Sequence, residues 1–91
     1  MDDEKFGLLG YIISSTYRTK SLKAIYQGEE TPTHIANNAN IKVNHISKVL
    51  KELKTKKIAV CINEENKKNR IYKLTSLGEE IGDYMNDKKM F

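Results

Sequence analysis

Apolar residues recur at helical spacing in the centre of the chain, between Thr31 and Leu53. Thr31 and Pro32 predict the start of a short helix, because a hydroxyl caps free backbone amides and proline is tolerated at the first helical position. The buried side of this helix consists of Ile35, Ala36 and Ala39. A second helix carries four apolar residues at the i, i+3, i+4, i+7 spacing of one stripe, namely Ile46, Val49, Leu50 and Leu53. Two short helices joined by a tight polar turn predict a helix-turn-helix.

The side of the second helix opposite its apolar stripe is polar and carries no acidic residue. With about 100° between successive residues, that line consists of Asn44, Lys48, Lys51 and Thr55, with His45 and Ser47 on its flanks. We therefore expect this helix to present a neutral to cationic face to solvent or to a partner.

Residues 4–26 also show helical spacing, although glycines interrupt it. The apolar positions on one line are Phe6, Leu9, Ile13 and Tyr17, continued by Leu22 and Ile25. Gly7 and Gly10 weaken the first turns. The pattern fits either one long helix or a loose segment followed by a firm helix that begins at the hydroxyl cluster of residues 14–16. Gly28 is typical of the residue just past a helix C-terminus.

Two short runs rich in β-branched residues follow the helix-turn-helix. Residues 58–62 (IAVCI) and 70–75 (RIYKLT) are separated by a polar segment, which predicts an antiparallel hairpin. Asn66 and Asn69 in that segment can take the positive φ that glycine usually supplies. A last helix is predicted to start at Thr75 or Ser76, where S-L-G-E is a capping-box pattern, and to bury Leu77, Ile81, Tyr84 and Met85.

Length and composition favour one small domain over residues 1–91. The chain is 38% hydrophobic and 31% charged, which suffices for a modest core, and it has one cysteine, Cys61, which excludes an internal disulfide. The longest apolar run, residues 8–13, is far shorter than the roughly 20 residues of a membrane span. Acidic residues precede this run, where a signal peptide is basic. We expect a cytoplasmic protein with no membrane partner.

The net charge of +4 is divided unevenly along the chain. Residues 42–73 contain ten Lys or Arg and three Glu, a net charge of +7, whereas the remainder carries −3. A solvated lysine-rich helix is common and would not by itself indicate nucleic acid. Here, however, the basic half coincides with the helix-turn-helix and the hairpin, which favours a polyanion as the partner.

The order of elements and three sequence motifs resemble a known superfamily. The motifs are YRTKSLKAI (17–25), TPTHIANNANIKVNHISKVLKELKTKKIAVCI (31–62) and NRIYKLTSLGEEI (69–81). Together they are similar to the MarR-like and ArsR-like winged helix-turn-helix transcriptional regulators, and closely to small archaeal members. The resemblance implies a mainly α fold with a small antiparallel β-hairpin (α+β), ordered helix, helix, helix, hairpin as wing, helix.

The resemblance also implies which residues contact DNA. It makes residues 43–56 the recognition helix that enters the major groove, where asparagine and lysine side chains reach base edges or phosphates. Lys42 stands where the family usually has a short polar cap, and Asn69 where many relatives have glycine. The expected contacts from this helix are Lys42, Asn44, His45, Ser47, Lys48 and Lys51. The start of the preceding helix contributes Thr31, Thr33 and His34, and the wing contributes Lys67, Lys68, Asn69 and Arg70.

The sequence gives little indication of a metal site, a cofactor site or catalysis. His34, His45 and Cys61 match no zinc spacing, and no glycine-rich phosphate loop or catalytic triad pattern is present, so we expect no metal, no cofactor and no enzymatic activity. Arg18 has two interpretations of equal weight. Relatives carry arginine there, which suggests a functional role, whereas an ion pair with Glu29 or Glu30 would be structural.

The sequence thus predicts a sequence-specific, double-stranded DNA-binding transcriptional regulator, with a winged-helix protein interaction module as the alternative. A small recognition helix reads few base pairs, so we expect a homodimer. Its interface would use apolar residues in candidate dimerisation extensions, residues 1–13 and 76–91, among them Phe6, Leu9, Ile13, Tyr84 and Met85. The sequence does not indicate which operator the protein binds or whether it has a small-molecule effector.

Overall fold

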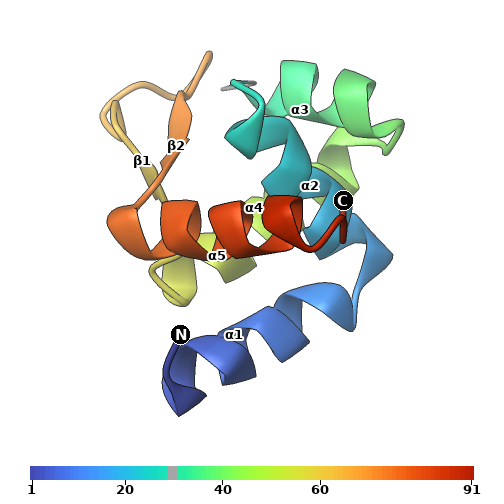
Figure 1. Ribbon diagram of the computed structural model, residues 1–91. Coiled ribbons are helices and arrows are strands. Elements are labelled where there is room, and N and C mark those ends of the chain that lie inside the picture. Colours follow the sequence, from blue (N-terminus) through green and yellow to red (C-terminus); the bar gives the residue numbers. More distant parts are fainter. Residues whose placement is uncertain (29–30) are drawn as a thin grey trace.

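The computed structural model describes residues 1–28 and 31–91, and within these ranges it contains helices and one hairpin (Figure 1). The elements are α1 (Asp3–Ile13), α2 (Thr16–Tyr26), α3 (Pro32–Ala39), α4 (Val43–Thr55), β1 (Ala59–Cys61), β2 (Tyr72–Leu74) and α5 (Ser76–Asp87). The two strands pair in antiparallel fashion. This confirms the predicted fold class, a mainly helical winged helix-turn-helix, with one more helix than the sequence suggested.

The additional helix arises from a break at residues 14–15. Ser15 has extended backbone angles, and its hydroxyl accepts a hydrogen bond from the Arg18 amide at 3.2 Å, which starts α2. Asp2 caps α1 in the same way, by accepting from the Lys5 amide at 2.9 Å. The single long helix is therefore wrong, and so is the loose N-terminal segment. The hydroxyl cluster does start a firm helix, but the residues before it form a capped helix despite their glycines.

The break also changes which N-terminal residues enter the core. Ile12 is fully buried and Leu9 is 6% exposed, whereas Phe6, Ile13 and Tyr17 are 44%, 48% and 42% exposed. The apolar line predicted across these positions assumed one continuous helix. Because α1 and α2 are separate helices, the line is interrupted after Ile13, and Tyr17 belongs to the exposed start of α2.

The helix-turn-helix consists of α3, a three-residue turn and α4. Thr31 accepts a hydrogen bond from the His34 amide at 3.3 Å and Pro32 is the first residue of α3, as predicted. Asn40 ends α3 in the left-handed conformation, and the Ile41 amide donates to the Ala36 carbonyl at 3.0 Å. The predicted stripe of α4 is confirmed: Ile46, Leu50 and Leu53 are fully buried, and Val49 is 4% exposed.

The hairpin is joined to α5 by Thr75. Ala59, Val60 and Cys61 pair with Leu74, Lys73 and Tyr72 respectively. The Thr75 hydroxyl accepts from the Gly78 amide at 3.1 Å and donates to the Lys57 carbonyl at 2.7 Å. Thr75, rather than Ser76, is therefore the N-cap residue of α5, and Ser76 is the first residue of the helix. The helix buries Ile81 and Met85 completely, whereas Leu77 and Tyr84 are half-buried.

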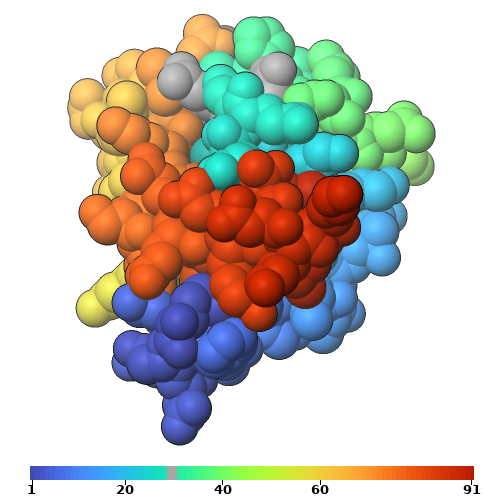
Figure 2. Space-filling model, viewed as in Figure 1, coloured from blue at the N-terminus to red at the C-terminus, as the bar shows by residue number. Residues whose placement is uncertain are grey.

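The two terminal helices share one face of the molecule. In Figure 2 the N-terminal residues, in blue, lie directly beside α5, in red. The Phe6 and Tyr84 rings meet edge to face at a centroid distance of 5.7 Å, and Lys5 Nζ lies 2.6 Å from Glu80 Oε2. Leu9 and Met85 are withdrawn into the core beneath this face, so neither can supply a dimer surface as predicted. Among the expected interface residues, Phe6, Ile13 and Tyr84 keep exposed area.

Candidate nucleic-acid interface

The outward side of α4 is exposed along its whole length. Asn44, Lys48, Lys51 and Thr55 are all exposed, as are His45 and Ser47 on its flanks. Glu52 is the one acidic residue of the helix and is half-buried. Lys42 precedes the helix with no capping hydrogen bond from its side chain, as its sequence indicated.

A hollow lies between the start of α3, one flank of α4 and the wing, which we define as residues 62–71 between the two strands. Its volume is about 540 Å³. It is lined by Thr31, Pro32, Thr33, Ser47, Lys51, Lys54, Lys67, Asn69, Arg70 and Tyr72. Seven of these residues were predicted from the sequence as DNA contacts, and they come from three separate segments. The fold therefore assembles hydroxyl groups and cationic groups around one concave surface, which we call the wing-side hollow.

The wing is held in shape by its own hydrogen bonds. The Asn63 side chain accepts from the Ile71 amide at 2.7 Å and donates to the Asn69 carbonyl at 3.1 Å. Arg70 Nε donates to the Asn66 carbonyl at 2.9 Å. Asn69 has a φ of 54°, as predicted, whereas Asn66 is not among the positive-φ residues. Lys67 and Lys68 are exposed at the tip, so their ammonium groups are available to a partner.

The remaining predicted contacts lie outside the wing-side hollow. His45 packs edge to face against Tyr17, with 5.4 Å between ring centroids. His34 is exposed on α3, and Lys42 lines a separate hollow with the end of α3. Asn44 and Lys48 project from the outward side of α4 rather than into the hollow. The structure thus divides most of the predicted contacts between the outward side of α4 and the wing-side hollow, and it places His34 and Lys42 outside both.

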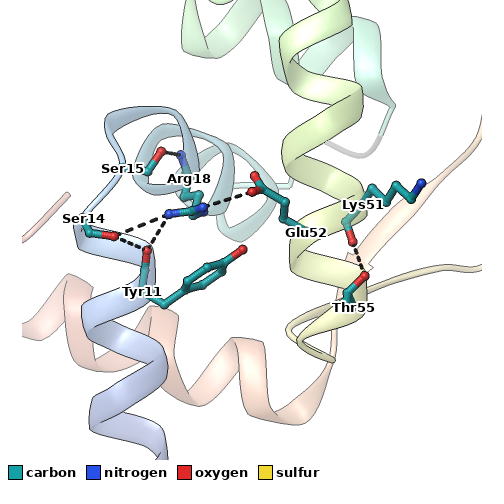
Figure 3. A network of polar contacts seen from close by, with 7 residues as sticks. All are labelled: Tyr11, Ser14, Ser15, Arg18, Lys51, Glu52 and Thr55. Atoms are coloured by element: carbon teal, nitrogen blue, oxygen red, sulfur yellow. Dashed lines mark hydrogen bonds and ion pairs between the residues drawn. The ribbon is translucent and has the colours of Figure 1, made fainter.

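Arg18 forms a network that joins α1, α2 and α4 (Figure 3). Its Nη2 donates to Glu52 Oε2 at 3.0 Å, its Nη1 donates to the Tyr11 carbonyl at 3.1 Å, and its guanidinium carbon lies 3.9 Å from the centre of the Tyr11 ring. The hydrogen bond to Glu52 raises the pKa of Arg18 above its ordinary value. Arg18 therefore makes an ion pair, but with Glu52. Glu29 and Glu30, the predicted partners, lie outside the described residues.

Neither metal binding nor membrane insertion has support in the described part of the chain. Cys61 is buried in β1, and residues 1–28 and 31–91 hold no group of three or more His, Cys, Asp or Glu side chains that could bind a metal ion. The helices of these same ranges are too short or too polar to cross a bilayer.

Comparison with solved structures identifies the same fold in three other proteins. NadR in complex with 4-hydroxyphenylacetate matches with a TM-score of 0.68 and 16% identity, over 93% of this chain and 64% of NadR. A MarR family transcription regulator, SP03579, matches with a TM-score of 0.64 and 23% identity, over 92% of this chain and 64% of that one. This chain therefore spans just under two thirds of the length of both structures.

A third structure covers nearly the whole chain. It is the homodimeric winged helix-turn-helix DNA-binding domain (fragment 1–100) of Mb0332 from Mycobacterium bovis, described as a possible ArsR-family regulator. It matches with a TM-score of 0.69 and 18% identity, over 99% of this chain and 85% of that one. No protein-family model matches the sequence, and no curated protein matches it either. The resemblance to archaeal members in particular stays a prediction.

Sequence reasoning missed several side chains at this surface. Lys54 lines the wing-side hollow, where it forms an ion pair with Glu64. Tyr17 stands beside His45 because α2 begins at Thr16, a boundary that the sequence left open. Lys54 could have been found from the sequence, because it lies on the same flank of α4 as Ser47 and Lys51.

Proposed function

We propose that this protein is a transcriptional regulator that binds double-stranded DNA, with α4 in the major groove and the wing on the backbone or in the minor groove. The observation that carries the proposal is the wing-side hollow. Hydroxyl groups at the start of α3, two lysines of α4 and the basic wing line this hollow, whose volume is about 540 Å³. Hydroxyl, lysine and arginine side chains are the groups that proteins use to bind DNA phosphates.

The outward side of α4 supplies the groups that would read bases. Asn44 can bond the adenine edge through two hydrogen bonds, and Lys48 can reach guanine oxygens. Both side chains are exposed near the start of a helix that protrudes beside the hollow, together with His45 and Ser47. Phosphates bound at the hollow would fix the register of the helix, and the base edges would then determine specificity.

The alternative role, a protein interaction module, fits the surface less well. An interaction face usually has an apolar centre with few charges. The exposed face of α4 carries Lys48 and Lys51, and the wing adds Lys67 and Lys68. Two neighbours in fold are described as a MarR family transcription regulator and as a winged helix-turn-helix DNA-binding domain, which supports the DNA-binding role and a non-enzymatic protein.

We also propose that two copies associate through the face shared by α1 and α5. Phe6 and Ile13 are large apolar side chains of α1 that are 44% and 48% exposed, and the Phe6 ring contacts the half-buried Tyr84 of α5. The neighbour from Mycobacterium bovis is described as homodimeric. A dimer would present two recognition helices to half-sites about one helical turn, roughly 34 Å, apart.

Selection of binding sites from random duplex DNA tests the function directly. We expect enrichment of an inverted repeat whose half-sites are centred about 10 base pairs apart, because each subunit reads one half-site. Recovery of random sequences without enrichment would contradict sequence-specific binding.

Substitutions on the outward side of α4 should reduce specificity without affecting stability. Asn44→Ala and Lys48→Ala should each weaken binding to the selected duplex by about 1 to 3 kcal/mol. Titrations against selected and scrambled duplexes measure the effect, and melting temperatures should stay unchanged because both side chains are exposed. Asn86→Ala, at an exposed position of α5, is the matched control. A large loss of melting temperature in either α4 variant would show that the side chain has a structural role instead.

Polar substitutions on the terminal face should produce a monomer. Phe6→Gln together with Ile13→Gln removes exposed apolar area while leaving the buried Leu9 and Ile12 in place. In sedimentation at micromolar concentration, we expect the unaltered protein at twice the 10.5 kDa chain mass and the double variant at 10.5 kDa. The monomer should fold and bind one half-site weakly. An unaltered protein that sediments as a 10.5 kDa species would rule out the dimer.

A further inference from the structure

A second hollow lies beside α4, where α1 approaches the recognition helix. Its volume is about 390 Å³, and it is lined by Tyr11, Lys48, Lys51, Glu52, Thr55 and Lys56. Lys51 lines this hollow and the wing-side hollow as well, so the two hollows lie on either side of the outward face of α4. We call this one the Tyr11 hollow.

The Tyr11 hollow is rich in positive charge. Lys48, Lys51 and Lys56 contribute three ammonium groups, and Lys56 Nζ lies 5.1 Å from the centre of the Tyr11 ring. All three lysines are exposed, and none of them has an ion pair among the described residues. An anion that enters the hollow would therefore meet ammonium groups that no carboxylate of the described residues neutralises.

Among the described residues that line the hollow, the single carboxylate already has a partner. Glu52 accepts a hydrogen bond from Arg18 at 3.0 Å, and the two side chains are 29% and 19% exposed. Arg18 is held in position from α1, because its guanidinium stacks on the Tyr11 ring and donates to the Tyr11 carbonyl (Figure 3). The positive charge of Arg18 thus offsets the one negative charge on the recognition helix.

We propose that the Tyr11 hollow binds a backbone phosphate of the DNA strand opposite the one contacted by the wing. The proposal rests on the proposed function, since it requires α4 to lie in the major groove. A helix in that groove has a phosphate backbone on each side of it. The wing-side hollow faces one backbone, and the Tyr11 hollow is the cationic surface on the other flank. Lys56 supplies the new phosphate contact, and Arg18 is a positioning residue that acts by neutralising Glu52.

The phosphate contact is tested with Lys56→Gln, for which Lys89→Gln is the matched control. Both variants lose one exposed positive charge, and Lys89 lies beyond α5, outside both hollows. Lys56→Gln should weaken binding to any duplex about fivefold per subunit, as expected for one charge about 4 Å from a phosphate in water. The slope of log affinity against log salt should fall by about 0.9 per subunit. Equal behaviour of the two variants would overturn the phosphate site while leaving DNA binding intact.

The role of Arg18 is tested with a charge cycle. Glu52→Gln should raise duplex affinity about fivefold per subunit, because it removes the only negative charge among the described residues that line the hollow. Arg18→Gln should lower affinity about fivefold per subunit, because Glu52 is then unpaired. The double variant should return to within about twofold of the unaltered protein, since two glutamines carry the same net charge as the Arg18–Glu52 ion pair. Both Arg18→Gln and the double variant should melt at a lower temperature than the unaltered protein, because both lose the contact of Arg18 with the Tyr11 ring.

Each alternative gives a different result. Should Arg18 bind phosphate directly, Glu52→Gln would not restore affinity in the double variant, and the neutralising role would be overturned. If Arg18→Gln fails to fold, the Glu52→Gln variant alone tests the proposal. A duplex affinity of Glu52→Gln that is equal to or lower than that of the unaltered protein would contradict it. Absence of duplex binding by the unaltered protein would overturn this proposal together with the proposed function.

Discussion

Raising the salt concentration from about 50 mM to about 200 mM should weaken DNA binding by about 10³- to 10⁵-fold, the range for a dimer that makes roughly 6 to 10 phosphate contacts. The physical reason is the release of counterions from DNA when lysine and arginine side chains neutralise its phosphates. The residues that would do so are concentrated between residues 42 and 73, which carry ten of the sixteen basic side chains. Titration of a labelled duplex at several salt concentrations measures the slope.

The contribution of the wing can be separated by a matched pair of double variants. Lys67→Gln with Lys68→Gln should weaken binding to all duplexes alike and reduce the salt slope by about 2 per subunit. Lys88→Gln with Lys89→Gln removes the same charge from the exposed end of the chain and should leave the slope unchanged. Arg70 is left unchanged in these variants, because its Nε donates a hydrogen bond to the Asn66 carbonyl and so stabilises the wing. Binding that does not vary with salt would exclude this mode of DNA binding.

Gly78→Ala should lower the free energy of unfolding by about 3 kcal/mol and the melting temperature by about 12 to 24 °C. Gly78 is buried in the first turn of α5. A Cβ atom there would overlap the Ile58 carbonyl oxygen and approach the Leu74 Cβ to 3.2 Å. The oxygen belongs to the backbone at the base of the hairpin, so relief requires α5 and the hairpin to move apart. Thermal unfolding followed by circular dichroism measures the loss.

Gly10→Ala is the control for this substitution. Gly10 also lies within a helix, but no heavy atom outside its own turn lies within 4 Å of an added Cβ. Alanine should therefore stabilise the protein by about 0.5 to 1 kcal/mol, because it has the higher helix propensity. Equal melting temperatures for the two variants would show that α5 does not pack closely on the hairpin.

The parts of the fold that sequence predicted correctly are those determined by neighbouring residues. The stripe of α4 depends only on helical spacing, and the start of α3 depends on Thr31 and Pro32. The break at residues 14–15 was not resolved, because a serine can cap a helix or lie inside one, and glycine propensity is a weak guide. At the break, the Ser15 hydroxyl caps α2, and the Arg18 and Thr19 side chains donate to the Tyr11 and Ile12 carbonyls at the end of α1.

The candidate site shows the same division between local and distant information. Basic and hydroxyl residues were predicted from charge and from the resemblance, and the structure brings many of them around one hollow. The ion pair of Arg18 with Glu52 spans 34 positions along the chain, so no local pattern could reveal it. The proximity of Tyr11 to α4 likewise depends on how α1 packs once the break separates it from α2.

The hydrogen bonds of the Asn63 side chain within the wing bear on the thermodynamics of DNA binding. Because its carboxamide bonds the Ile71 amide and the Asn69 carbonyl, the loop between the strands already has a defined conformation before DNA is present. A loop that is disordered in the free protein loses conformational entropy when it binds, and that loss lowers affinity. This wing has less such entropy to lose, so more of the attraction between its lysines and DNA contributes to affinity.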